Sequence, residues 1–306
     1  MTVARWAFAA LGIGLFTACS GPQHPWSREE ACTATKAAEQ SVDNDWELWV
    51  QLLLRGYDKE THRATSPAVD CTGAQVKWDA PAMACNDTAT ARAQLPDKPI
   101  TEADVVVNQI TPDLRLVWVI TNRFASGDAL GPAAIVEIRP TYVIVRAVGP
   151  LRANAQRVKL RLEQLGKTEA LVAEGEQCAS KDPASCVKAA RLLPYWQHRF
   201  VADLVSSEGG TCLQPTLFYL AREESSKLES GWRRRFRLTG ALLFDPQGFM
   251  VQEELVAQDY DPKSPTTPPQ TFRKAHSDQT IRLVEGKLVG DKSSLWSKMR
   301  SLQDSP

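Results

Sequence analysis

The chain has 306 residues, in which 36 Lys and Arg are balanced by 36 Asp and Glu, and 43% of all residues are hydrophobic. The absence of net charge argues against nucleic acid or a polyanionic surface as the main partner. The length is sufficient for one large or two modest hydrophobic cores. After residue 19, no apolar stretch approaches the length of a membrane-spanning helix.

The N-terminus has the pattern of an export signal. One cation, Arg5, precedes an apolar run from Trp6 to Phe16, and small residues separate this run from Cys19. A basic residue followed by an apolar stretch too short to span a bilayer is the order found in secretory signal peptides. We therefore expect residues 1–18 to direct export and to be removed.

The end of this run, Thr17-Ala18-Cys19, is similar to a lipobox, and the first nineteen residues resemble the N-terminus of exported bacterial lipoproteins. The resemblance implies that Cys19 carries lipid and holds the protein at a membrane of the cell envelope. Ser20 in the next position resembles lipoproteins sorted to the outer membrane, which implies a protein on that membrane facing the periplasm. Ordinary secretion and a retained anchor are the alternatives.

The seven cysteines fit an oxidising compartment. An odd number would leave one reactive thiol there, whereas lipid on Cys19 leaves six cysteines for three disulfides. Fifteen connectivities are allowed, so any pairing is a hypothesis. The spacing favours the pairs Cys71–Cys85, Cys178–Cys186 and Cys32–Cys212. The sequence contains no CxxC or CxxH spacing of the kind that zinc sites use. We expect neither a metal nor a cofactor.

The mature chain begins with a short tether, residues 19–26, followed by a helical pattern. Ser27 and Glu30 form a capping box, and apolar residues then recur every three to four positions. This predicts a long N-terminal helix that ends near Gly56. Its tryptophans, Trp46 and Trp49, either anchor a binding partner or, as we favour, pack the helix on a sheet. Residues 58–103 are proline-rich and predict an irregular, disulfide-stapled segment.

Strands joined by tight turns are predicted from Asp104 to Asp291. The turns are Thr111-Pro112-Asp113, Arg139-Pro140, Gly166-Lys167, Asp245 to Gly248 and Glu285-Gly286. A two-residue turn at Gly166-Lys167 fixes a register. The facing pairs are then Leu165 with Thr168, Lys159 with Glu174 and Arg157 with Glu176. Residues 187–207 are ambiguous between strand and helix, and Ser293 to Leu302 predicts a short C-terminal helix.

These elements predict an α+β fold dominated by an antiparallel sheet of about ten to twelve strands, more than an open sheet usually holds flat. The sheet should curl or divide in two, with the long N-terminal and the short C-terminal helix packed on it. Residues 27–103 and the β-rich residues 104–306 then form one domain. Division near residues 178–186 is the alternative.

A cluster of arginines is the most prominent charge pattern, and alternate members share one face of a strand. The row is Arg233, Arg235 and Arg237. Such a row could bind an anion or a partner. A bulge at Gly248 would place Arg235 opposite Asp259 and Arg233 opposite Asp261, which neutralises the row within its own sheet, and we favour this. A slip of one residue would instead place Arg234 opposite Asp259.

Catalytic patterns are weak. The four histidines are scattered, and no HExxH, GxSxG or phosphate-binding motif occurs after the leader. His198 is the best single candidate for a general base. Four glutamates could form a glycosidase pair only if the fold brings them together, and two acidic pairs are weak metal motifs. The glutamates are Glu223-Glu224 and Glu253-Glu254. The acidic pairs are Asp43 with Asp45, and Asp259 with Asp261.

The expected function is therefore binding without catalysis. We expect a lipid-anchored envelope protein that acts as a scaffold or accessory subunit, with envelope proteins as partners, a membrane contact through Cys19, and no nucleic acid. One alternative is a carrier that holds a lipid or another apolar ligand in a sheet-enclosed cavity. Another is an envelope hydrolase that uses carboxylates or His198.

Overall fold

The structure is a computed structural model. It describes residues 24, 31–36, 45–66, 68–73, 76, 85, 98–124, 127–178, 186–201, 204–264 and 266–299. Several predictions lie outside these residues: the signal peptide, the lipidated Cys19, all of the tether except His24, the capping box at Ser27 and Glu30, and Asp43.

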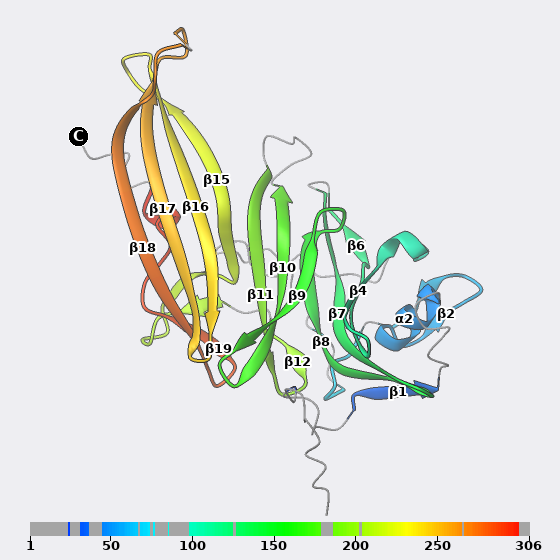
Figure 1. Cartoon of the computed structure of the whole chain (residues 1–306). Helices are drawn as coiled ribbons and strands as arrows, with labels where there is room; N and C mark the ends of the chain where they lie inside the picture. Colours follow the sequence, from blue (N-terminus) through cyan, green and yellow to red (C-terminus); the bar gives the residue numbers. More distant parts are fainter. Residues whose placement is uncertain are drawn as a thin grey trace, which may run out of the picture.

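One curved sheet of 17 strands makes up most of the fold (Figure 1). Its first part, in order of pairing, is β4-β5-β7-β8, with β6 beside β7 and β1 beside β8. The bounds are β1 Thr33–Lys36, β4 Val105–Thr111, β5 Leu114–Val119, β6 Asn122–Arg123, β7 Asp128–Arg139 and β8 Tyr142–Asn154. Tight turns connect β4 to β5 and β7 to β8, as predicted.

The second part runs β9-β10-β11-β15-β16-β17-β18-β19-β13-β14. Its strands are β9 Lys159–Leu165, β10 Thr168–Cys178, β11 Cys186–Trp196, β13 Leu204–Ser206, β14 Cys212–Pro215, β15 Leu217–Lys227, β16 Arg233–Asp245, β17 Gly248–Tyr260, β18 Gln270–Val284 and β19 Lys287–Gly290. The short β12, Arg199–Phe200, joins the two parts because it pairs with both β11 and β8.

The prediction of an α+β fold with a long N-terminal helix is wrong. Residues 33–36 form β1 on the edge of β8, and the helix α2 spans only Trp46–Leu53. Asp45 starts this helix, because its carboxylate accepts a hydrogen bond from the Leu48 backbone at 3.0 Å. Pairing with β8 therefore overrides the helical periodicity before residue 37.

Other helical structure is also sparse. A 3-10 turn, η2, spans Glu102–Asp104, and the predicted C-terminal helix is, in its described part, a single 3-10 turn, η4, Trp296–Lys298. The hairpin β2 (Tyr57–Asp58) and β3 (Arg63–Ala64) follows α2. Among the described residues, no helix combines the length and apolar character needed to cross a membrane.

Strand β5 is buried along its whole length because it is covered on both faces. Val117 and Val119 pack with Trp49 of α2, whereas Leu116 and Trp118 pack with side chains of β8 to β11. Trp49 is 1% exposed. This tryptophan therefore docks its helix on the sheet rather than anchoring a partner at the surface.

The turn at Gly166-Lys167 has the predicted register, with Leu165 opposite Thr168 and Lys159 opposite Glu174. Arg157 also forms an ion pair with Glu176. The ambiguous residues after 187 are mainly extended: they form most of β11, then β12 and β13. Local turn chemistry is thus sufficient to set these hairpins.

All six expected cysteines form disulfides, but two pairs differ from the prediction. Cys178–Cys186 is confirmed, whereas the other bonds join Cys32 to Cys71 and Cys85 to Cys212. The first exchange follows from β1, which brings Cys32 to β8, where Cys71 also contacts the Arg146 carbonyl. Three disulfides are compatible with an extracellular or envelope location.

Candidate functional site

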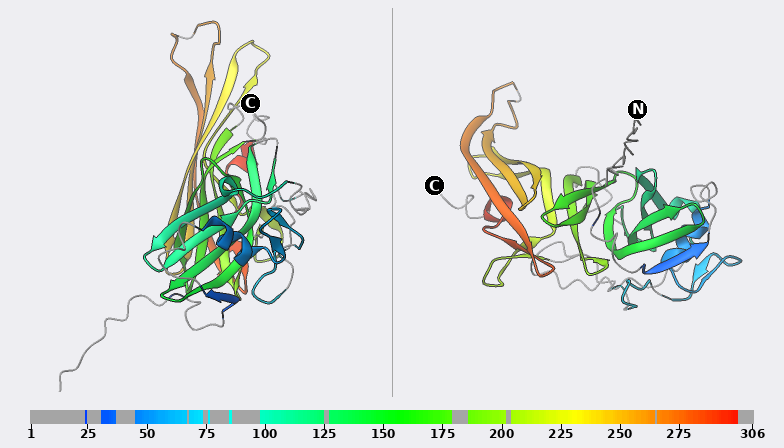
Figure 2. Two further views of the ribbon diagram at one scale, coloured as in Figure 1. Left: turned by 90° about the vertical axis from the view of Figure 1, so that its right-hand side faces the viewer. Right: turned by 60° about the horizontal axis from the view of Figure 1, so that its bottom comes forward.

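Strands β15 to β18 project beyond the rest of the molecule (Figures 1 and 2). We call residues 223–239 and 254–278 the arm. Pairing of β11 with β15 ends at Ala221, and pairing of β19 with β18 ends at Ile281. Beyond these points, no further strand of the described chain covers either long edge of the arm.

The free edge of β18 is solvent-exposed from Gln270 to Lys274, and Phe272 is the one apolar residue in this range. Lys274 binds Glu254 of β17 at 2.8 Å, and His276 lies 3.1 Å from Asp278 on its own strand. An unpaired edge presents backbone N–H and C=O groups that can pair with another chain. Charged side chains along it limit which chains can approach.

The arginine row does not have the predicted register. Arg234, rather than Arg235, lies opposite Asp259, and the two side chains form a double hydrogen bond at 2.7 and 3.0 Å. Hydrogen bonding to Asp259 raises the pKa of Arg234 above its ordinary value. Arg233 faces Tyr260 instead of Asp261. The predicted neutralisation of the row by Asp259 and Asp261 is therefore wrong.

The physical reason is the turn between β16 and β17. Asp245 lies directly opposite Gly248, so the turn contains only two residues and no bulge. The Asp245 carboxylate accepts hydrogen bonds from the backbone N–H groups of Gln247 and Gly248 at 2.6 and 2.9 Å. This compact cap shifts the register by one residue.

The arginine row consequently lies on the face opposite to Asp259. Arg237 pairs with Glu223 at 3.2 Å, and both side chains are about half exposed. Arg235 donates to the Gln258 side chain at 3.1 Å, a neutral partner. Arg233 is exposed. This face of the arm retains positive charge available to a partner.

A pocket of about 510 Å³ lies at the base of the arm, and we call it the arm-base pocket. Strands β14 and β15 supply an apolar wall, and the segment 294–297 closes the opposite side. The polar and aromatic lining includes Arg222, Glu253, Tyr219 and Trp296, together with Cys85. The volume is within the range of small-molecule sites.

Glu253 is the buried acid of this pocket. Its carboxylate accepts hydrogen bonds from the Ser294 hydroxyl at 2.5 Å and from the Leu295 backbone at 2.6 Å. Burial raises the pKa of Glu253, although these bonds and Lys298 oppose the shift. The acid therefore fastens the C-terminal segment across the concave side of the sheet.

Replacement of Glu253 by Gln should change how stability depends on pH. Between the ordinary carboxyl pKa and the raised folded-state pKa, the native state binds more protons than the unfolded chain. Stability therefore falls as the pH rises through this range. The amide does not titrate. We expect the wild type to lose stability relative to Glu253→Gln as the pH rises above the ordinary carboxyl pKa, measured by urea unfolding. The exposed Glu102→Gln variant should show no such trend, and parallel curves for wild type and Glu253→Gln would contradict this assignment.

His198 lies in the tight turn between β11 and β12, with φ of 62°. It lines a pocket of about 620 Å³ together with the turns at Gly166-Lys167 and Pro246-Gln247. No carboxylate is among the described residues that line this pocket.

The candidate glutamates are engaged separately. Glu223 binds Arg237, Glu254 binds Lys274, and Glu253 holds Ser294. Glu253 and Glu254 also point to opposite faces of β17. Within the described chain, these contacts do not assemble the paired carboxylates of a glycosidase.

The three described members of the two acidic pairs, Asp45, Asp259 and Asp261, also have structural roles. Asp45 caps α2, Asp259 binds Arg234, and Asp261 accepts a hydrogen bond from the Lys263 backbone at 2.9 Å. A calcium site needs further oxygen ligands around such groups. Among the described residues, the one cluster with metal-ligand spacing is Glu176 with Cys178 and Cys186, whose sulfurs form a disulfide.

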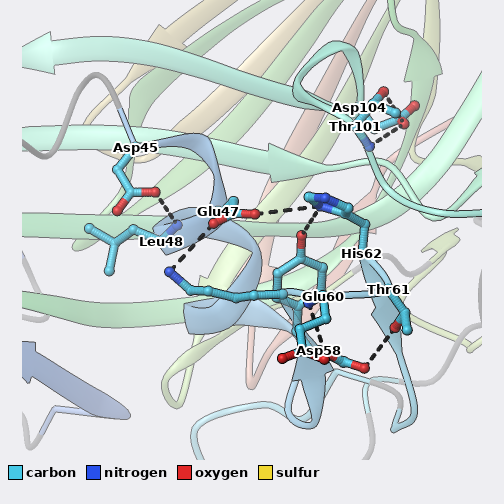
Figure 3. A network of polar contacts seen from close by, with 11 residues as sticks. Asp45, Glu47, Leu48, Asp58, Glu60, Thr61, His62, Thr101 and Asp104 are labelled. Carbon is cyan, nitrogen blue, oxygen red and sulfur yellow. Dashed lines mark hydrogen bonds and ion pairs between the residues drawn. The ribbon is translucent and has the colours of Figure 1, made fainter.

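A polar network around α2 was not apparent in the sequence (Figure 3). His62 lies 3.0 Å from the Tyr57 hydroxyl and 3.4 Å from Glu47, and it stacks on Trp46. Burial, reinforced by Glu47 and Asp58, raises the pKa of Tyr57 to about 12. These contacts fasten the β2–β3 hairpin to the helix. The residues that make them are not spaced in any pattern that would have identified the network in the sequence.

Comparison with protein-family models, curated proteins and solved structures finds no match to this chain.

Proposed function

We propose that this protein is a non-enzymatic, lipid-anchored binding protein of the cell envelope, and that the arm docks an extended acidic segment of an envelope partner along the free edge of β18. The observation that carries the proposal is this edge, which is uncovered from Gln270 onwards over most of a 15-residue strand. Main-chain pairing along such an edge supplies affinity, and side chains beside it supply specificity.

The placement of the N-terminal region supports this arrangement. His24 binds Glu169 at 2.6 Å, close to the turn at Gly166-Lys167. Cys19 is five residues earlier in the sequence, so lipid on it would lie within about 18 Å of His24. The β16–β17 turn is beside the same end, because a Cβ on Gly166 would approach the Pro246 carbonyl at 3.7 Å.

From that turn, β16 and β17 each run for 13 residues to the tip of the arm. A strand of this length spans about 40 Å. A lipid on Cys19 would therefore hold one end of the molecule at the membrane while the arm reaches away from it. This geometry suits an accessory subunit that contacts a partner at a distance from its own membrane.

The charges of the arm favour an acidic partner. Arg273 and Lys274 lie on the edge strand, and the arginine row follows two strands away. Of these cations, Lys274 and Arg237 have acidic partners, and both pairs are largely exposed, so their mutual attraction is weak. A partner carboxylate can compete for them.

Photo-cross-linking in cells that produce the full chain tests this proposal. A photoreactive residue in place of His276 should give a discrete adduct with an envelope protein, and Arg233→Glu combined with Arg237→Glu should reduce the adduct several-fold. Arg157 is a matched control site, because its side chain is 54% exposed and that of His276 is 57% exposed. Equal cross-linking from both sites, no adduct from His276, or an adduct of two copies of this chain would each overturn the proposal.

A further inference from the structure

We propose that the arm-base pocket binds a small apolar carboxylate, with Arg222 as the residue that receives the carboxylate group. This site is separate from the edge of β18 and does not depend on the docking of a partner there. The inference rests on the position of one guanidinium group and on the chemistry of the walls around it.

Arg222 contacts two aromatic rings. Its guanidinium carbon lies 4.3 Å from the centre of the Trp296 ring system and 4.6 Å from the centre of the Tyr219 ring. Two cation–π contacts of this kind hold the guanidinium group at the wall of the pocket. The Arg222 side chain is 27% exposed, so a ligand can reach it.

The donors of Arg222 are available. Its nearest acidic neighbour is Glu224, at 3.8 Å, and this carboxylate is half exposed. That separation is longer than a hydrogen bond, and Arg222 makes no hydrogen bond to any other residue that the structure describes. A guanidinium group whose donors make no hydrogen bond to the described chain can bind the two oxygens of a carboxylate.

The rest of the pocket favours an apolar ligand body. Its walls include Leu213, Pro215, Leu217 and Phe218. Glu253 also lines the pocket, but both of its oxygens already accept hydrogen bonds from the segment that closes the site. Burial also raises the pKa of Glu253, which weakens its repulsion of an incoming anion. The pocket thus combines mostly apolar walls with one cationic group that has only a distant, half-exposed acidic neighbour, the usual composition of a small-molecule site.

Calorimetric titration of the full mature chain with decanoate and with 1-decanol tests the inference. The two probes share an apolar body, and only decanoate carries the carboxylate. We expect wild type to bind decanoate at least tenfold more tightly than 1-decanol. Equal affinity for the two probes, or no binding of decanoate, would overturn the inference, and neither result requires a variant that folds.

Substitution then assigns the contact. Arg222→Met should weaken decanoate binding at least tenfold and leave 1-decanol binding unchanged. Arg123→Met is the matched control, because Arg123 pairs with Asp104 at the surface of the first part of the sheet, and it should change neither affinity. Full decanoate affinity in a folded Arg222→Met protein would contradict the role of Arg222. Because these titrations contain no partner protein, their outcome is independent of the cross-linking at His276.

Discussion

Asp128→Asn is expected to lower the free energy of unfolding by about 3–5 kcal/mol, the usual effect of removing one partner from a buried ion pair. Asp128 is fully buried at the start of β7, and Arg152 of β8 donates to it at 3.2 Å. Arg191 of β11 is also fully buried. The three charges lie where the first part of the sheet meets the second.

The cations of this cluster depend on the carboxylate. Burial, reinforced by the positive charge of Arg152, lowers the pKa of Arg191 to about 10, and Asp128 opposes this shift. Without the negative charge, two guanidinium groups would face each other in a medium of low dielectric constant. The loss should therefore far exceed the effect of breaking an ion pair at the surface.

Urea unfolding followed by circular dichroism measures this loss. Arg157→Met is the control, because it removes an ion pair whose two side chains are 54% and 40% exposed; such pairs contribute about 0–1 kcal/mol. If Asp128→Asn unfolds within about 1 kcal/mol of the wild type, the carboxylate does not hold this cluster together.

The parts of the fold that could be predicted are local. Short turns at Pro112-Asp113, Gly166-Lys167 and Glu285-Gly286 connect paired strands as expected, because turn residues and the alternation of side chains together select a register. The arginine row marks the limit of this reasoning. There, the sequence allowed a bulged turn and a two-residue turn, and the hydrogen bonds of Asp245 selected the second.

Contacts distant in sequence were not predictable in the same way. The residues of β1 continue a helical periodicity, and what makes them a strand is the edge of β8, more than one hundred residues later. The exchange of two disulfides follows from such pairings. The arm-base pocket was missed for a related reason, since Arg222, Glu253 and Trp296 come from three separate segments and none has a distinctive spacing.

The strands β15, β16 and β17 of the arm were predicted, but the part of β18 before Ile281 and the projection of the arm were not. Alternation of polar and apolar residues reports the burial of strand faces, whereas projection depends on where the neighbouring strands end. Strand β11 leaves β15 at Ala221 and β19 reaches β18 only from Ile281. The first endpoint has no proline or glycine, and the second has only Gly290 opposite Ile281, so the sequence does not mark where the arm begins.

The paired substitution Cys85→Ser and Cys212→Ser is expected to lower the free energy of unfolding by about 5 kcal/mol, against about 2.5 kcal/mol for the same change at Cys178 and Cys186. The difference arises in the unfolded chain. The first disulfide joins residues 127 positions apart and the second joins residues 8 positions apart, and the entropy lost on closing a loop increases with its length.

This disulfide also connects stability to the proposed ligand site. Cys85 lines the arm-base pocket, and Cys212 begins β14, the strand that supplies Leu213 to its apolar wall. Without the bond, we expect both the lower stability and a several-fold loss of decanoate affinity, whereas the Cys178–Cys186 variant should keep its affinity. Guanidinium unfolding and calorimetry on the two double variants measure these effects. If the Cys178–Cys186 variant loses more stability than the Cys85–Cys212 variant, loop length does not determine how much each disulfide stabilises the protein.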